Sequence, residues 1–305
     1  MVFNKVYKLN TGAEIPAVGL GTWQSPDEQV YEAVKTAIAS GYRHIDTAWA
    51  YDNEAAVGRA IRDALKENGL ERKDIFVTTK LWSTFHRPEK VEEAINTSLS
   101  NLGLDYLDLF LVHWPVALDP TLGQKIPTRP DGTRALDPEV TIEQTWAAME
   151  KVYESGKAKA IGVSNWSIPN LERLLKSAKV VPAVNQIEMH PYLPQQKLLD
   201  FCASKGIHCT AYSPLGSTDS PLLKDETIAK IAEKRNVSPA QVAISWGAAR
   251  GSVLPKSVTP SRVKSNIELI ELSPEEIAEI DGLQKKLTKR FVKPAWGVPV
   301  FDEDF

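Results

Sequence analysis

Three short apolar runs of this chain each end in a side chain that can hold or move a proton. The three residues are Asp46, Lys80 and His113, and Tyr51 follows closely after the first of them. A carboxylate, a tyrosine, a lysine and a histidine brought to one place can polarise a carbonyl group and deliver a proton to it. Together the four side chains predict general acid catalysis on a carbonyl compound, provided that the fold brings them to one place.

The runs that carry these residues are typical of buried strands in an alternating strand–helix chain, because each is short, apolar or β-branched, and followed by a helix-like stretch. The predicted strands are 17–21, 43–46, 75–80, 107–113, 159–164, 182–187, 207–212 and 252–256. The predicted helices are 27–40, 53–67, 88–102, 142–155, 168–178, 195–205, 239–249 and 261–269. Eight such pairs predict an α/β chain folded as a (β/α)8 TIM barrel, with an open doubly wound sheet as the alternative. In a barrel, the C-terminal strand ends share one mouth, which would bring the four side chains together.

Several segments lie outside the eight repeats. They are a hairpin of 7–9 and 13–15 around a glycine turn, an added helix at 222–235, a C-terminal helix at 274–287, a proline-rich loop at 114–141 and a C-terminal tail at 288–305. We predict a single domain, 1–305. The long loop has no periodicity, and a loop of that length usually has a functional role. We therefore expect the loop, and the tail with it, to contribute to substrate choice at the mouth.

The composition excludes several classes of function. The 305 residues are 43% hydrophobic and 25% charged with a net charge of −3, so we expect no nucleic-acid partner and no anionic membrane. The first residues lack the apolar core of a signal peptide, and no run approaches the roughly 18 apolar residues of a membrane span. Only Cys202 and Cys209 are present, too few for a disulfide framework, and the five histidines show no metal-ligand spacing. We expect a cytoplasmic protein without a metal.

Familiar catalytic motifs are absent, and each candidate catalytic residue also has a possible purely structural role. The chain has no GxGxxG, P-loop or HExxH, and the segment 162–166 has Trp166 where a nucleophile elbow needs glycine. Taken singly, Asp46 could cap a helix, Lys80 could be a solvated strand end, and His113 could be a core histidine. Their joint placement at the ends of three predicted strands favours the catalytic interpretation.

Seven short motifs follow one another along the chain. They are Gly41-Tyr42-Arg43-His44-Ile45-Asp46-Thr47-Ala48 with Tyr51, Asn53 and Glu54; Thr79-Lys80-Leu81-Trp82; His113-Trp114-Pro115; Gly162-Val163-Ser164-Asn165; Asn185-Gln186; Tyr212-Ser213-Pro214-Leu215-Gly216; and Leu254-Pro255-Lys256-Ser257. This pattern, from about residue 5 to 296, resembles the aldo-keto reductases. Through the segments 126–128, 131–135 and 215–224 it looks most similar to the fungal NADP-dependent glycerol dehydrogenases and glyceraldehyde-type aldehyde reductases.

The resemblance implies a reductase that takes a hydride from NADPH. Tyr51 would protonate the carbonyl oxygen, with its pKa lowered by the Lys80 cation, and Asp46 would keep Lys80 charged and oriented. His113 would donate a hydrogen bond to the substrate oxygen. The catalytic residues implied are therefore Asp46, Tyr51, Lys80 and His113.

The resemblance also carries over binding positions. For NADPH they are Thr22, Trp23, Asp46, Ser164, Asn165, Gln186, Tyr212, Ser213, Pro214, Leu215, Ser217, Lys256, Ser257, Val258, Thr259, Arg262 and Asn266. Substrate would meet Trp23, Trp49, Tyr51, Trp82, His113, Trp114 and Trp296. One departure is Ser265, which stands where many relatives have a glutamate that touches the adenine, so we expect NADH to be usable but to bind more weakly.

The resulting expectation is an NADPH-dependent oxidoreductase that reduces small aldehydes and ketones and oxidises polyols such as glycerol in reverse. The alternatives are a pentose-type aldose (xylose) reductase and a non-catalytic NADPH-binding subunit or sensor on the same scaffold. We expect a monomer or weak dimer whose partners are small carbonyl or polyol molecules.

Overall fold

The computed structural model describes residues 3–218 and 220–301. Eight parallel strands form one sheet in chain order. They are β3 (Leu20–Gly21), β4 (His44–Asp46), β5 (Phe76–Leu81), β6 (Leu109–Val112), β7 (Ile161–Ser164), β8 (Val184–Glu188), β9 (His208–Tyr212) and β10 (Ser252–Leu254). The sheet closes because the amide of Gly19 donates to the carbonyl of Val253 at 2.9 Å, and that of Val253 to the carbonyl of Ala17 at 2.8 Å. The predicted (β/α)8 barrel is therefore confirmed.

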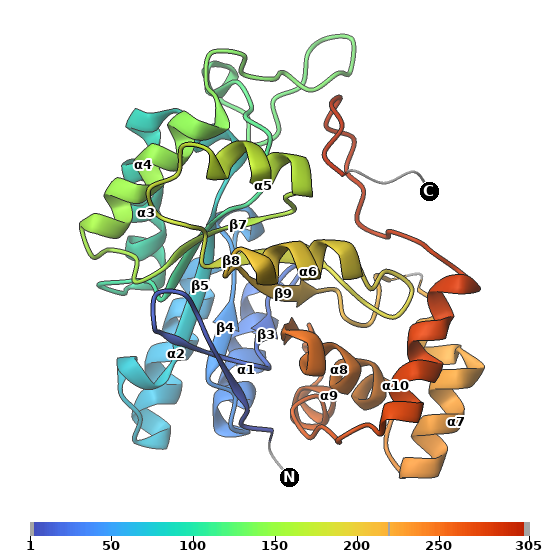
Figure 1. Cartoon of the computed structure of the whole chain (residues 1–305). Coiled ribbons are helices and arrows are strands. Elements are labelled where there is room, and N and C mark those ends of the chain that lie inside the picture. The colour runs from blue at the N-terminus through green and yellow to red at the C-terminus, as the bar shows by residue number, and fades with distance from the viewer. Residues whose placement is uncertain (1–2, 219, 302–305) are drawn as a thin grey trace.

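The helices surround the strands (Figure 1). They are α1 (Asp27–Ala39), α2 (Glu54–Asn68), α3 (Pro88–Leu102), α4 (Ile142–Glu154), α5 (Ile168–Leu175), α6 (Gln196–Ser204), α7 (Glu226–Arg235), α8 (Pro239–Arg250), α9 (Pro260–Ser265) and α10 (Pro274–Asp281). Four predicted helices were too long by three residues or more. The helix predicted at 222–235 begins only at Glu226, because the side chain of Asp225 accepts the amide of Thr227 and caps it. Those predicted at 168–178, 261–269 and 274–287 end at Leu175, Ser265 and Asp281.

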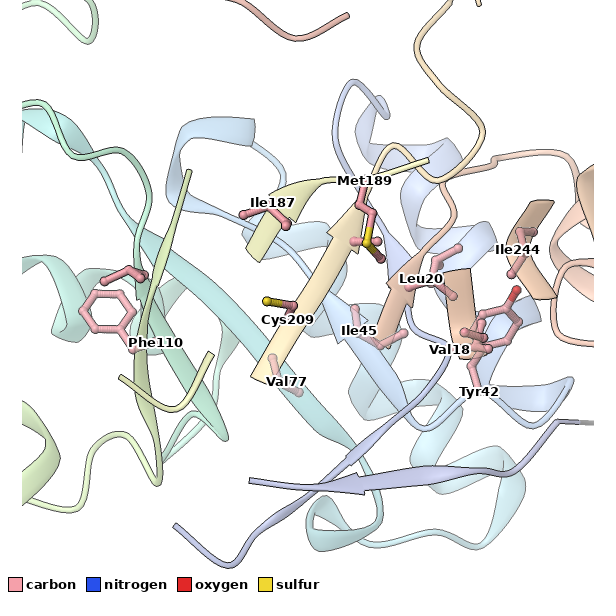
Figure 2. Close-up of a cluster of buried hydrophobic side chains, with 14 of the residues drawn as sticks. Val18, Leu20, Tyr42, Ile45, Val77, Phe110, Ile187, Met189, Cys209 and Ile244 are labelled. Atoms are coloured by element: carbon pink, nitrogen blue, oxygen red, sulfur yellow. The ribbon is translucent and has the colours of Figure 1, made fainter. Parts of the chain in front are cut away.

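The strand residues alternate between two environments, as a pleated strand requires. Ile45, Val77 and Phe110 belong to the large apolar cluster that also contains helix residues (Figure 2). Their neighbours His44, Asp46, Thr78, Lys80, Leu109 and Leu111 therefore point into the barrel. This alternation puts Asp46 and Lys80 inside the barrel, near the C-terminal ends of β4 and β5.

The predicted N-terminal hairpin is present, formed by the antiparallel strands β1 (Val6–Lys8) and β2 (Glu14–Pro16). Gly12 turns the chain between them at φ +86°, a conformation that suits glycine. Leu9 and Ile15 pack against Phe76 at the start of β5, in a separate cluster of buried side chains. The hairpin thus covers the N-terminal end of the barrel and leaves the other end to the loops.

The long loop 114–141 and the described part of the tail, up to residue 301, lie at the same end of the molecule (Figure 1). The loop was predicted to have no regular structure, but it folds back on itself, with antiparallel bridges between Leu118 and Leu136 and between Thr128 and Arg134. The part of the tail that the structure describes is anchored by Trp296, which is buried. In the described parts of the chain, every helix is too short or too polar to cross a membrane.

Candidate active site

A cavity of about 930 Å³ opens where the strands end. Most of the residues that sequence reasoning assigned to the site line it: Thr22, Trp23, Asp46, Tyr51, Trp82, His113, Trp114, Ser164, Asn165, Gln186, Tyr212, Ser213, Pro214, Leu215, Ser217, Lys256, Arg262 and Trp296. They come from the ends of strands and from the loops that follow. The barrel therefore brings together residues that lie more than 230 positions apart in the sequence, such as Thr22 and Lys256, because all its strands end at one mouth.

Lys80 links two of the predicted catalytic side chains. Its Nζ donates to Oδ1 of Asp46 at 2.6 Å, to the carbonyl of Thr47 at 2.9 Å, and to the phenolic oxygen of Tyr51 at 3.3 Å. The three donor positions of the ammonium group are thus all used. Lys80 lies beneath the cavity floor with 1% of its side chain exposed, so it acts on the cavity only through Tyr51 and Asp46.

Asp46 is held from both sides. Its second carboxylate oxygen accepts the side-chain amide of Gln186 at 2.7 Å, and its backbone carbonyl accepts the hydroxyl of Thr22 at 2.9 Å. Burial raises the pKa of Asp46, and Lys80 opposes that effect. For Lys80 burial acts to lower the pKa, but Asp46 and Tyr51 outweigh it, so the net pKa is raised. The lysine therefore stays charged at neutral pH.

The pKa of Tyr51 differs from the expectation. We predicted that Lys80 lowers it below the ordinary value, but burial raises the pKa of Tyr51 and the opposing effect of Lys80 is smaller. The sequence predicts the neighbouring cation but not the desolvation that accompanies it. The phenol is consequently protonated at neutral pH, which is the form that a proton donor needs.

His113 stands beside the phenol. Its ring centroid is 5.8 Å from that of Tyr51, with the two rings nearly perpendicular, and 5.3 Å from that of Trp82. Burial lowers the pKa of His113 well below its usual value, and the Lys80 cation adds to the effect. The imidazole is therefore neutral and carries one N–H that can donate to an oxygen in the cavity.

A cluster of polar side chains lies next to His113, at the C-terminal ends of β7, β8 and β9. The side-chain amide of Asn165 donates to the carbonyl of His113 at 3.0 Å and to the hydroxyl of Ser164 at 3.1 Å. Its oxygen accepts the hydroxyl of Tyr212 at 2.7 Å, and Ser164 donates to the carbonyl of Gln186 at 2.8 Å. Asn165 adopts φ +65°, which an asparagine tolerates better than most residues. The amides, hydroxyls and tyrosine ring present here fit a planar group that bears a carboxamide.

Lys256 and Arg262 supply positive charge at another part of the lining. Lys256 donates to the carbonyl of Gln24 at 3.2 Å, and within the described residues neither cation forms an ion pair with a carboxylate. Partial burial lowers the pKa of Lys256. Two cations without a carboxylate fit a phosphate group, as the expected 2′-phosphate of NADPH requires.

Some predicted binding residues lie outside the lining. Ser257, Val258, Thr259 and Asn266 form the turn before α9 and the cap after it; there the hydroxyl of Ser257 accepts the amide of Thr259 at 3.1 Å. Their binding role stays a prediction. The ring of Trp49 packs edge-on against Phe85, with centroids 5.0 Å apart, rather than in the lining of the cavity.

The other tryptophans predicted to meet the substrate form an aromatic wall. The centroid of Trp296 lies 6.0 Å from that of Trp82 and 5.3 Å from that of Trp114. Trp23 is on the rim with 43% of its surface exposed. Sequence reasoning named the long loop and the tail as a whole but missed the individual residues that line the cavity: Lys125, Ile126, Arg134, Phe291, Val292, Lys293 and Pro294.

One contact explains how the long loop reaches the site. The indole N–H of Trp82 donates to the carbonyl of Lys125 at 2.6 Å, and the Lys125 ammonium pairs with Asp52 at 2.5 Å. Both partners of Lys125 lie close in sequence to predicted catalytic residues: Trp82 is two positions after Lys80, and Asp52 is one position after Tyr51. This closeness could have indicated that the two residues meet another part of the site. The loop has no periodicity that would predict which of its residues contacts the indole.

Comparison with known proteins agrees with this geometry. The sequence model described as "Aldo/keto reductase family" matches residues 17–285. The chain is 52% identical over 302 residues to a Saccharomyces cerevisiae protein named glycerol 2-dehydrogenase (NADP(+)), covering 96% of this chain and 95% of that one. It is 49% identical over 299 residues to D-galacturonate reductase of Hypocrea jecorina, with 96% of each covered. The solved aldose reductase of Schistosoma japonicum has a TM-score of 0.89 at 42% identity, covering 94% of this chain and 93% of that one.

Proposed function

Because the chain belongs to the aldo/keto reductase family, we propose that it is an NADP-dependent oxidoreductase that reduces small aldehydes and ketones to alcohols. In the reverse direction it oxidises polyols such as glycerol. The observation that carries the proposal is the run of contacts from Asp46 through Lys80 to Tyr51, with neutral His113 beside the phenol. A relative named for NADP-dependent oxidation of glycerol, 52% identical, supports the cofactor and the substrate class.

The proposed mechanism assigns a task to each catalytic side chain. NADPH, when bound, supplies the hydride that reduces the carbonyl carbon. Tyr51 gives its phenolic proton to the carbonyl oxygen as negative charge develops there, and Lys80 stabilises the phenolate that remains. Asp46 holds the Lys80 ammonium in place, and His113 donates a hydrogen bond that fixes the direction of the substrate oxygen. In the reverse direction the Tyr51 phenolate accepts the proton of the alcohol.

The residues at the mouth fit the two ends of the cofactor. Ser164, Asn165 and Gln186 would hold the nicotinamide carboxamide, with Tyr212 against its ring, and these groups already lie within hydrogen-bond distance of one another. Lys256 and Arg262 would hold the 2′-phosphate. We propose that the remaining contacts with NADPH are made by Thr22, Trp23, Ser213, Pro214, Leu215, Ser217, Ser257, Val258, Thr259 and Asn266.

The substrate would occupy the remaining part of the cavity, against Trp82, Trp114 and Trp296. An aromatic wall of this size suits an aldehyde of a few carbons, or an aromatic one, and a pentose remains the alternative substrate. A sensor without turnover is the alternative of another class. The complete contact chain to Tyr51 favours catalysis.

Further properties belong to the proposal as well. We propose a cytoplasmic protein of one domain, 1–305, that acts as a monomer or weak dimer without nucleic-acid partners. The net charge of −3 supports the absence of nucleic-acid partners, and the small number of cysteines supports a reducing compartment.

The test is a turnover assay in both directions. The chain is mixed with NADPH or NADH and a panel of glyceraldehyde, xylose, benzaldehyde and a simple ketone, and loss of the reduced cofactor is followed. Glycerol with NADP⁺ tests the reverse reaction. Preference for glyceraldehyde with NADPH supports the proposal, preference for xylose supports the pentose alternative, and cofactor binding without turnover supports the sensor.

A further inference from the structure

Glu188, the last residue of β8, carries a buried carboxylate that the proposed mechanism does not use. One carboxylate oxygen accepts the backbone amide of Phe291 at 2.7 Å, and the other accepts that of Val292 at 2.8 Å. The ring of His190 bonds the first oxygen at 2.9 Å, and the Arg290 guanidinium lies 3.8 Å from the second. The side chain of Glu188 has no exposed surface. A fully buried carboxylate therefore holds the backbone of the tail by two charge-assisted hydrogen bonds.

The bonded tail residues are themselves part of the cavity. Phe291 and Val292 line it, together with Lys293, Pro294 and Trp296 further along. Trp296 then packs against Trp82 and Trp114. Only a few residues without helix or strand separate Val292 from Trp296. The position of Trp296 in the aromatic wall therefore depends on where Glu188 holds the tail backbone.

The same anchor lies beside the loop after β9, which carries Ser213, Pro214, Leu215 and Ser217 of the proposed cofactor site. A methyl group added at Gly216 would come within 3.4 Å of the Phe291 ring, so the loop after β9 and the tail are in close contact. On β8, Gln186 and Glu188 are two residues apart and therefore point to the same side of the strand. Gln186 bonds Asp46 while Glu188 bonds the tail, so one strand fixes both the catalytic carboxylate and the substrate wall.

We propose that Glu188 is a positioning residue for substrate selection: its carboxylate fastens the tail at Phe291 and Val292 and so sets the place of the aromatic wall. It touches neither the proton donor nor the cations at the phosphate end. Its loss should change how substrates fit more than it changes the chemical step or the affinity for NADPH. The kinetic part of this inference rests on the proposed reductase function, whereas the anchoring part does not.

The chain offers a matched control in Glu150 on α4. This glutamate is also buried, and one oxygen of its carboxylate accepts two successive backbone amides, those of Lys179 at 2.7 Å and Val180 at 2.9 Å. The loop that it fastens leads into the start of β8, at the opposite end of the barrel from the mouth, and none of its residues lines the cavity. Glu150→Gln therefore makes the same substitution at a buried carboxylate that bonds a loop backbone, without touching the substrate wall.

The experiment compares wild type, Glu188→Gln and Glu150→Gln in the full chain. Hydrogen exchange of the anchored amides is measured first, since it needs no activity. Glutamine offers one acceptor oxygen in place of two, and Phe291 and Val292 bond different oxygens of Glu188, so exchange at 291–292 should be at least about tenfold faster in Glu188→Gln. The amides of Lys179 and Val180 bond the same oxygen of Glu150, which glutamine keeps, so exchange at 179–180 should change less in Glu150→Gln. KM and kcat for glyceraldehyde and benzaldehyde follow, with NADPH affinity measured by fluorescence quenching.

We expect Glu188→Gln to change the ratio of the two KM values by about tenfold or more, with kcat and NADPH affinity changed much less. Glu150→Gln should leave all three unchanged. Unaltered exchange at 291–292 in Glu188→Gln would overturn the anchor, and faster exchange with an unaltered KM ratio would overturn the role in selection. If Glu188→Gln does not fold, Glu188→Asp keeps the charge but withdraws the carboxylate, and the same readouts decide. Absence of turnover in wild type would contradict the proposed function and, with it, the role in selection, while the exchange data still decide the anchor.

Discussion

The ammonium nitrogen of Lys80 lies 2.6 Å from a carboxylate oxygen of Asp46, with only 1% and 4% of the two side chains exposed to solvent. Removing one partner of such a pair leaves a buried charge without compensation, at a cost of about 3–5 kcal/mol. Replacing both partners by uncharged groups costs far less. The pair can therefore be tested separately for its contribution to stability and for its contribution to catalysis.

The first prediction is a double-mutant cycle on this pair. Lys80→Met and Asp46→Asn should each lower the free energy of unfolding, and the double variant should recover part of the loss because no charge is left unpaired. Turnover should not recover, because no cation remains beside Tyr51. Denaturant titration and initial rates on the four proteins provide the measurement. A double variant as active as wild type would remove the pair from the mechanism.

The second prediction concerns pH. Because burial raises the pKa of Tyr51, the phenol keeps its proton through the neutral range, and kcat/KM for reduction should fall only at alkaline pH as the phenol ionises. Oxidation should rise with pH over the same alkaline range. Because burial lowers the pKa of His113 well below its ordinary value, the imidazole stays neutral through the pH range in which a free histidine gains its proton. An acid limb centred near pH 6.5 in the reduction profile would show that His113 titrates there.

The third prediction separates the two cofactors. Lys256→Ala or Arg262→Ala should weaken NADPH far more than NADH, because only NADPH carries the 2′-phosphate. Bonds to charged groups contribute roughly 1.5–3 kcal/mol each, or about one to two decades in affinity. The matched control is Lys264→Ala, an exposed cation on the same helix α9 that does not line the cavity. Equal weakening of NADPH and NADH would show that Lys256 and Arg262 do not bind that phosphate.

The barrel and the core of the site could be predicted from the sequence for a physical reason. Asp46, Lys80 and His113 end apolar runs, and a parallel barrel carries all such ends to one mouth. Tyr51 and the strand-end polar residues Ser164 and Gln186 follow from the same rule together with the family pattern. Short strands with a two-residue alternation leave little freedom in where their ends can lie.

The remainder depends on tertiary contacts that one sequence does not encode locally. The rise in the pKa of Tyr51 comes from its burial in the folded chain, and the orientation of Trp49 comes from its contact with Phe85. The pairing of 128 with 134 inside the long loop has no periodic signal. Glu188 lies one residue beyond a strand predicted at 182–187, and its partners are about 100 positions away in the tail.

The fourth prediction concerns the long loop and the tail. Shortening 118–136 removes Lys125, Ile126 and Arg134 from the lining, so it should change the preference between glyceraldehyde and benzaldehyde while NADPH affinity stays close to wild type. Deleting 297–305 should have a smaller effect in the same direction, because Val300 and Phe301 pack on the aromatic wall without lining the cavity. If both truncations leave the selectivity ratio unchanged, specificity lies with the strand-end residues instead.

The central claim is that Tyr51 donates the proton, and Tyr51→Phe tests it most directly. The change keeps the ring and deletes only the hydroxyl that lies 3.3 Å from Lys80. The measurement is the rate of a single turnover of glyceraldehyde with NADPH already bound, alongside NADPH affinity. We expect the single-turnover rate of Tyr51→Phe to fall by at least the ~10²–10⁴-fold typical of general acid catalysis, with NADPH affinity close to that of wild type. A single-turnover rate near that of wild type would contradict it.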